Sequence, residues 1–182
     1  MELILERAFP GMAVLRRREG LLHVTVPNVD TISVLARVRA EQNLKVLQLI
    51  SAVDRIEENQ LQLTWILEDP SDSFVFIVSS RYPREDCTVP TVSGMWPAAE
   101  AFERELHEMY GIDFPGSPRQ GEDFLLEGWK GVPPMLRDFD TLEYSMRTFG
   151  ERWPREHVDP RRYIGEKVGE WDTPLGSGEE GE

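Results

Sequence analysis

The sequence predicts an α+β fold in which a mostly antiparallel four-stranded sheet carries helices on one face and is followed by a long irregular C-terminal arm. Three observations predict this fold. Apolar residues alternate in four stretches before residue 80, an amphipathic helix follows near residues 97–110, and regular periodicity ends after Pro118. The order strand, helix, three strands, helix is typical of an α+β domain.

The first half of the chain supplies the expected sheet. Residues 2–9 are predicted to form a short helix or lead-in that ends at Pro10 and Gly11, and a helix begins at Asn28 or Asp30 and runs to about Gln42. Alternation of apolar and polar residues predicts four strands, at residues 21–26, 45–56, 61–67 and 74–79. The run at 45–56 is unusually apolar, which favours a central position in the sheet.

Residues 80–95 are predicted to form a long loop, because Pro83 and Pro90 favour extended backbone before them. The helix that follows starts near Pro97, which suits a first turn, and is expected to stop at Gly111. A loop of this length beside a helix in a compact domain is often functional.

Charge is dense on that helix, and two interpretations stay open. Ala99, Phe102, Leu106 and the Met109–Tyr110 pair recur as one apolar stripe. The charged residues are either a solvated face with weak ion pairs or a ridge that docks on another subunit. Glu100, Arg104, His107 and Glu108 are expected opposite the stripe, with Glu103 and Glu105 at its edges.

After Pro118 the chain keeps many large apolar residues but shows no helix or strand period. Arms rich in Trp, Phe, Leu and Pro commonly lie along a partner protein, whereas an irregular coil packed on its own domain is the alternative. We therefore expect an α+β domain at 1–118, an extended partner-binding arm at 119–173 and a disordered acidic tail at 174–182. The arm should be mobile in the isolated chain and ordered in a complex.

Composition excludes several classes of function. Cys87 is the one cysteine, and a single thiolate does not hold an iron–sulfur cluster. The three histidines, His23, His107 and His157, share no metal-ligand spacing. The sequence has no glycine-rich phosphate loop and no nucleophile-turn motif. We therefore predict no catalytic, cofactor-binding or metal-binding residue in this chain.

The charge pattern points toward protein partners. Net charge is −13, and residues 96–182 hold ten basic and twenty acidic side chains, which gives −10 for the second half. Such a surface repels nucleic acid and anionic lipid. No apolar run approaches the ~18 residues of a membrane span, and the acidic N-terminus does not resemble a signal peptide. We expect a cytoplasmic protein that meets the membrane only through partners.

One stretch resembles a known family. Glu103-Arg104-Glu105, then Glu108 to Ile112, then Phe114 and Gly116, resemble the hallmark of the 30 kDa subunit family of respiratory complex I. That family also supplies the matching subunit of membrane-bound nickel-iron hydrogenases related to complex I. Val89-Pro90, Trp96-Pro97 and Pro133-Pro134 extend the resemblance from about residue 20 to residue 140. The chain departs from the complex I pattern at Ser117-Pro118-Arg119, where that pattern has His-Pro, a leucine and paired arginines.

The resemblance implies a cofactor-free peripheral subunit at the inner face of the cell membrane. It implies docking on a large catalytic subunit, which holds the nickel-iron or quinone site, and a position near a small iron–sulfur subunit. The departure after Gly116 favours the hydrogenase or ferredoxin-linked type over NADH:quinone oxidoreductase. The expected interface residues are Glu103, Arg104, Glu105, Glu108, Tyr110, Phe114, Trp129, Arg137, Asp138 and Phe139.

Two other functions fit parts of the pattern. Glu103 and His107 lie one helical turn apart, so together with Glu105 they suggest a free-standing acid–base enzyme. A generic acidic adaptor unrelated to redox complexes is the second alternative. A deep polar pocket at the Glu103–His107 pair would favour the enzyme, and co-purification with a redox protein would count against the adaptor.

Overall fold

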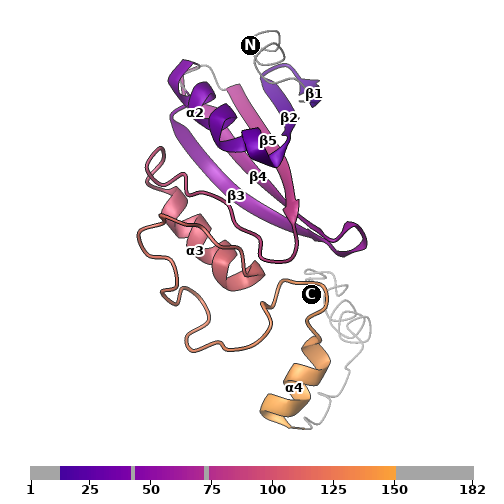
Figure 1. Cartoon of the computed structure of the whole chain (residues 1–182). Helices are drawn as coiled ribbons and strands as arrows, with labels where there is room; N and C mark the ends of the chain where they lie inside the picture. The colour runs from indigo at the N-terminus through magenta and orange to yellow at the C-terminus, as the bar shows by residue number, and fades with distance from the viewer. Residues whose placement is uncertain (1–12, 42–43, 72–73, 151–182) are drawn as a thin grey trace, which may run out of the picture. The chain divides into compact units, whose positions relative to one another are not determined.

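The computed structural model describes residues 13–41, 44–71 and 74–150 (Figure 1). Its strands are β1 (Ala13–Arg18), β2 (Leu21–Val26), β3 (Val46–Arg55), β4 (Gln60–Asp69) and β5 (Phe74–Pro83). Its α-helices are α2 (Thr31–Glu41), α3 (Ala99–Tyr110) and α4 (Thr141–Phe149), and two short 3-10 turns are η1 (Asn28–Asp30) and η2 (Ile56–Glu58). The contacts divide the chain after Asp140 into two units, which are described separately. The predicted lead-in at 2–9, the end of the arm after Gly150 and the tail at 174–182 lie outside the described residues.

The sheet is mixed and has five strands in the order β1-β2-β5-β4-β3. The prediction of a mostly antiparallel four-stranded sheet therefore missed one strand, and one of the four strand pairs is parallel. Strand β1, whose three consecutive arginines obscure any alternation, pairs antiparallel with β2. Strand β2 runs parallel to β5. The parallel pair arises because α2 carries the chain back across the sheet before the β3-β4-β5 meander, a crossover that parallel pairing requires.

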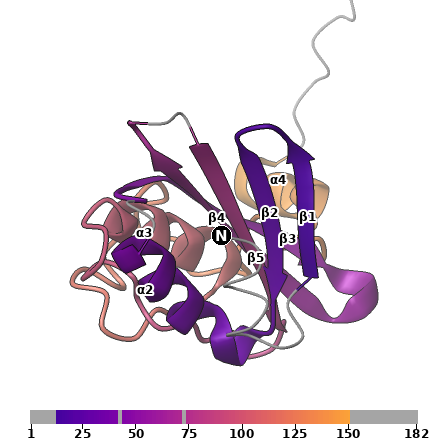
Figure 2. The same cartoon turned by 90° about the horizontal axis from the view of Figure 1, so that it is seen from above.

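The prediction that the helices lie on one face of the sheet is confirmed for α2 and α3 (Figure 2). Strand β4 is buried at alternate residues on that face, from Leu61 through Trp65 to Leu67. Helix α2 adds Val34, Leu35 and Val38 to the same core. The run at 45–56, expected at the centre, is instead the edge strand β3, because the β4-β5 hairpin lies between it and β2.

The segments on either side of α3 are joined to each other. Val89 donates its backbone N–H to the Asp113 carbonyl at 2.8 Å, and Asp113 donates to the Cys87 carbonyl at 2.8 Å. Ile112 and Phe114, which follow the helix, are almost fully buried. The long loop after β5 is therefore folded onto the segment that leaves α3, and the two together fix how the helix sits on the sheet.

Helix α4 lies in the segment that was expected to be irregular. Its apolar residues Leu142, Met146 and Phe149 recur at helical spacing and are exposed. The signal was short, about two turns, and it stood next to a stretch without periodicity. A brief pattern of this kind is easily missed because its boundaries carry little information.

Candidate functional site

The part of the chain that the sequence singled out combines α3 with residues 119–140, here called the arm segment. Within the compact unit, this segment begins beside the first turn of α3, where Arg119 pairs with Glu100, and runs along the helix toward the ends of β3 and β5 (Figure 1). Its backbone is mostly irregular, so its conformation depends on side chains of the domain that accept or donate hydrogen bonds. Two acidic side chains supply most of these bonds.

Glu108 is the first of the two. Its Oε1 atom accepts backbone N–H groups from Phe124 at 3.3 Å and Leu126 at 2.7 Å, and its Oε2 atom accepts that of Leu125 at 2.7 Å. Three consecutive N–H groups that converge on one carboxylate form an anion-binding turn, here occupied by a side chain of the same protein. Glu108 therefore fixes the arm segment at its middle.

We expect Glu108→Gln to loosen this turn without unfolding the domain. A glutamine offers one acceptor oxygen in place of two and carries no charge, and bonds to charged acceptors contribute about 1.5–3 kcal/mol each in favourable cases. Amide exchange at residues 124–126 should accelerate at least about tenfold for a loss of about 1.4 kcal/mol, with little change at β4. Glu127→Gln, at an exposed position of the same segment, is the matched control. Unchanged exchange at 124–126 would contradict this role.

Asp54 is the second acidic anchor, at the end of β3. The Arg84 guanidinium donates Nε to Asp54 Oδ1 at 2.8 Å and Nη2 to Oδ2 at 3.0 Å, a two-point pair. The backbone N–H of Arg137 also donates to Oδ2, at 2.8 Å. The Arg84 hydrogen bonds hold the pKa of Asp54 below its usual value, against the opposing effect of burial.

Arg84 reaches the arm segment directly as well. Its Nη2 atom pairs with the Asp138 carboxylate, which lowers the pKa of Asp138, and the hydrogen bonds to Asp54 and then to Asp138 raise the pKa of Arg84. The Arg137 side chain pairs with Glu57 in η2. Two consecutive residues of the arm segment, both predicted as partner-interface residues, are thus used to attach the segment to its own domain.

The arm segment also packs closely against the C-terminal end of α3. Gly111 ends the helix in the left-handed conformation, with φ 72°, and its N–H donates to the His107 carbonyl at 2.9 Å. A Cβ at this position would lie 3.1 Å from Pro133 Cγ. Met135 then donates its backbone N–H to the Met109 carbonyl at 3.0 Å. Gly111 therefore serves both the left-handed helix end and the close approach of the arm segment.

Arg104 does not lie on a solvated face. Its guanidinium stands 4.7 Å from the centroid of the Phe124 ring, and its side chain is 12% exposed. The pairing with Glu100 is loose, at 3.9 Å, and within the described residues its buried Nε atom has no hydrogen-bond partner. The arm segment already covers Arg104 in the single chain, by a cation–π contact.

The buried position of Arg104 predicts an effect of Arg104→Ala on the stability of the isolated chain. An interface residue that is solvated in the free chain would leave the melting temperature nearly unchanged on substitution. Because Arg104 packs under Phe124, we expect the alanine variant to lose about 1 kcal/mol, the scale of a partly desolvated cation–π contact. Urea unfolding of the full chain measures it. Phe124→Leu should cost a similar amount, and the double variant should cost less than the sum, which tests the coupling.

Glu103 and Phe114 are part of the core rather than of the surface. Glu103 is 1% exposed, and its two carboxylate oxygens accept the Val92 N–H at 2.7 Å and the Thr91 hydroxyl at 2.6 Å. The structure therefore separates it from His107, whose Nδ1 lies 2.9 Å from the Ile112 carbonyl. The acid–base pair suggested by the spacing is not formed.

The remaining predicted interface residues lie at the surface of this region. Trp129 donates its indole N–H to the Val132 carbonyl at 3.1 Å, and its ring lies 5.6 Å from that of Phe139. Tyr110 is half-buried, and burial raises its pKa, helped by the nearby charges of Asp54 and Glu105. Glu105 is half-buried on α3. The interface role of these residues stays a prediction.

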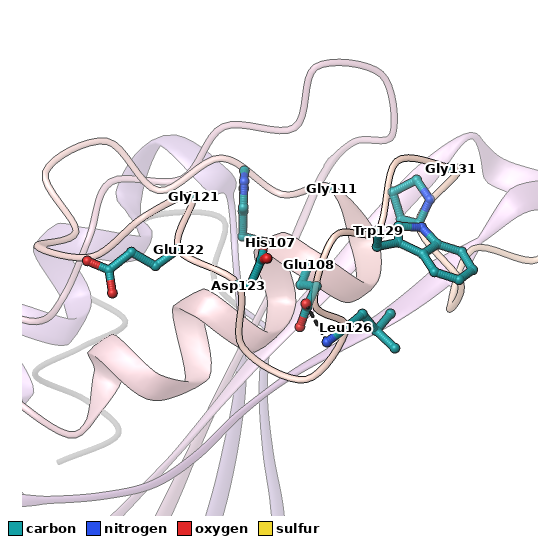
Figure 3. A pocket seen from close by; sticks show the side chains of 10 residues that line it. His107, Glu108, Gly111, Gly121, Glu122, Asp123, Leu126, Trp129 and Gly131 are labelled. Carbon is teal, nitrogen blue, oxygen red and sulfur yellow. Dashed lines mark hydrogen bonds between the residues drawn. The ribbon is translucent and has the colours of Figure 1, made fainter.

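A pocket of about 280 Å³ opens between α3 and the arm segment (Figure 3). Figure 3 shows His107 and Glu108 extending from α3, while Glu122, Asp123, Leu126 and Trp129 come from the arm segment. No pattern in the sequence predicts this pocket, because its wall exists only once Glu108 has folded residues 124–126 against the helix.

The described residues contain no group of three or more His, Cys, Asp and Glu side chains placed to bind a metal ion. Cys87 is buried, and burial raises the pKa of its thiol to about 11. None of the helices in the described part of the chain has the length and apolar character needed to cross a membrane.

The fold and the site together define an α+β domain that holds an irregular arm segment with its own carboxylates. Residues 24–145 match the family described as the 30 kDa subunit of respiratory-chain NADH dehydrogenase. The chain belongs to this family, which confirms the resemblance drawn from the motif at residues 103–116.

Curated relatives carry related names. The chain is 33% identical over 131 residues to the C/D subunit of NADH-quinone oxidoreductase from Phocaeicola vulgatus, a match that covers 71% of this chain and 24% of that protein. It is 28% identical over 137 residues to the C subunit of NADH-quinone oxidoreductase from Moorella thermoacetica, a match that covers 74% of this chain and 90% of that protein. The chain thus spans about a quarter of the Phocaeicola relative and most of the Moorella relative.

Two solved structures share the fold. A chain of the membrane-bound sulfane sulfur reductase, an archaeal respiratory membrane complex, matches with a TM-score of 0.74 and 29% identity, over 85% of this chain and 93% of that one. The trypsin-resistant fragment of Nqo5 matches with a TM-score of 0.57 and 28% identity, over 65% of this chain and 97% of the fragment.

Proposed function

We propose that this protein is a cofactor-free peripheral subunit of a complex-I-like membrane-bound oxidoreductase, in which it docks on the large catalytic subunit near the small iron–sulfur subunit. In this proposal the partners carry the iron–sulfur clusters and the nickel-iron or quinone site, and the assembly lies on the cytoplasmic side of the membrane. The chain contributes structure to the complex and no redox centre of its own.

The observation that carries the proposal is that charged side chains of the domain hold the arm segment in place. Three of its hydrogen-bonded ionic groups, Asp54, Arg84 and Glu108, bind the arm segment of the same chain. Leu125, Val132 and Met135 on that segment stay more than half exposed. An ordered segment with exposed large apolar side chains is typical of a surface that another protein covers.

We further propose the hydrogenase or ferredoxin-linked type of complex. The departure at Ser117-Pro118-Arg119 from the respiratory pattern supports it, as does the likeness to the archaeal sulfane sulfur reductase complex over 85% of the chain. The alternative is the 30 kDa subunit of a respiratory NADH:quinone oxidoreductase. The names of the curated relatives from Phocaeicola and Moorella favour that alternative.

Purification of the native complex through an affinity tag on this chain tests both points. We expect the tagged chain to bring down a large subunit and an iron–sulfur subunit from solubilised membranes, with iron in the complex and none in the isolated chain. Nickel without flavin would support the hydrogenase type, flavin with NADH oxidation would support the alternative, and recovery of the chain without any redox protein would overturn the proposal.

A further inference from the structure

The pocket between α3 and the arm segment is lined by acidic side chains without lysine or arginine among the lining residues. The acidic residues are Glu108, Glu122 and Asp123. Glu108 accepts three backbone N–H groups, whereas Asp123 accepts that of Gly128 through Oδ2 at 3.0 Å. Glu122 pairs with Arg119 through Oε2 at 2.8 Å, on an exposed side chain. The wall therefore carries three carboxylates, one of them paired with Arg119 from outside the lining.

The other polar side chain of the wall is engaged as well. His107 lies with Nδ1 2.9 Å from the Ile112 carbonyl, which only accepts, so Nδ1 is the donor of this bond. Trp129 adds an aromatic ring, whose face attracts cations. A group that donates hydrogen bonds and carries positive charge is complementary to this wall.

Apolar side chains that lie near the lining residues in the arm segment are exposed, and their backbone is anchored. Leu125 is 59% exposed although Glu108 binds its N–H, and Met135 is 54% exposed although its N–H binds the Met109 carbonyl. Val132, beside Trp129 Nε1, is 52% exposed. Because these side chains are presented by a fixed backbone, little conformational entropy is lost when a partner covers them.

We propose that this pocket binds an arginine or lysine side chain of the large subunit, from a segment whose neighbouring apolar residues cover Leu125, Val132 and Met135. This inference rests on the proposed function and identifies the surface through which the chain would bind the large subunit. The acidic balance of residues 96–182 favours a basic partner segment over a second copy of this chain, which would bring the same negative charge.

The test is a pair of matched double variants in the full chain. Glu122→Gln with Asp123→Asn removes two adjacent charges from the pocket wall and keeps side-chain size. Glu85→Gln with Asp86→Asn removes two adjacent, exposed charges from the loop after β5. Equal melting temperatures establish that both variants fold. Each is tagged, and retention of the large subunit is followed through a rising NaCl gradient.

We expect the pocket variant to release the large subunit at lower salt and to bind it at least about tenfold more weakly, whereas the control behaves as wild type. A photo-crosslinking residue at Leu125 should capture a peptide of the large subunit that contains an arginine or lysine beside apolar residues. Equal salt release of the two variants, or a crosslinked peptide without a basic residue, overturns the pocket assignment and leaves the proposed function standing. If the wild-type chain retains no redox protein, both the pocket assignment and the proposed function are overturned.

Discussion

Asp54→Ala is expected to cost about 3 kcal/mol of unfolding free energy, the low end of the range for breaking a buried ion pair. The substitution leaves the Arg84 guanidinium with Asp138 alone and removes the acceptor of the Arg137 N–H. A loss of this size lowers the melting temperature by about 2–4 °C per kcal/mol in a domain of this length. Hydrogen exchange of the variant should accelerate more at residues 135–139 than in β4.

Glu85→Ala is the matched control, since Glu85 is exposed and lies next to Arg84 in the chain. It should change the unfolding free energy by less than about 0.5 kcal/mol, as surface substitutions usually do. Equal stability of the two variants would mean that the Asp54 cluster contributes nothing to attachment of the arm segment.

The same cluster predicts a dependence on pH with a definite sign. The pKa of Asp54 is lowered in the folded chain from its ordinary value of 3.8, mainly by the Arg84 hydrogen bonds. A depressed folded-state pKa contributes stability that is complete above the ordinary value and is lost as pH falls through the folded-state value. Wild-type stability should therefore fall below about pH 4 more steeply than that of Asp54→Asn. Parallel curves would show that the charge of Asp54 does not matter.

Glu103→Ala is expected to cost about 3 kcal/mol, a combination of a cavity in the core and a buried Val92 N–H without an acceptor. The Thr91 hydroxyl loses its partner in the same step. Glu103→Gln keeps one acceptor oxygen and should recover about half of the loss. Urea unfolding of the full chain, with exchange at residues 92–96 as the local readout, measures both variants.

Glu105→Ala is the control for Glu103, because the two glutamates stand two residues apart on α3 but only Glu103 is buried. In the isolated chain the Glu105 variant should be nearly neutral, and its effect should appear only when the complex assembles. Equal losses at the two positions in the isolated chain would contradict the distinct roles assigned here.

The sequence by itself determined the local structure and the family. Periodicity placed β2, β3, β4, α2 and α3 close to their observed bounds, whereas β5 continues to Pro83, four residues into the predicted loop. Gly111 predicted the end of α3 because a left-handed helix end strongly favours glycine. The motif at residues 103–116 indicated the family by its resemblance to the hallmark of that family. In the structure its residues include a buried carboxylate, a helix end and two core residues, Ile112 and Phe114.

Only the tertiary structure decided which charged residues face the interior and where the arm segment runs. Glu103 and Glu105 are indistinguishable by spacing, and the backbone N–H of Val92, eleven residues away, decides which of them is buried. The contacts of Arg137 with Asp54 and of Leu125 with Glu108 join residues 83 and 17 positions apart. The parallel pairing of β2 with β5 is equally non-local. Such contacts depend on topology and leave no periodic signal in the chain, because the partner that satisfies each polar group is chosen by the fold.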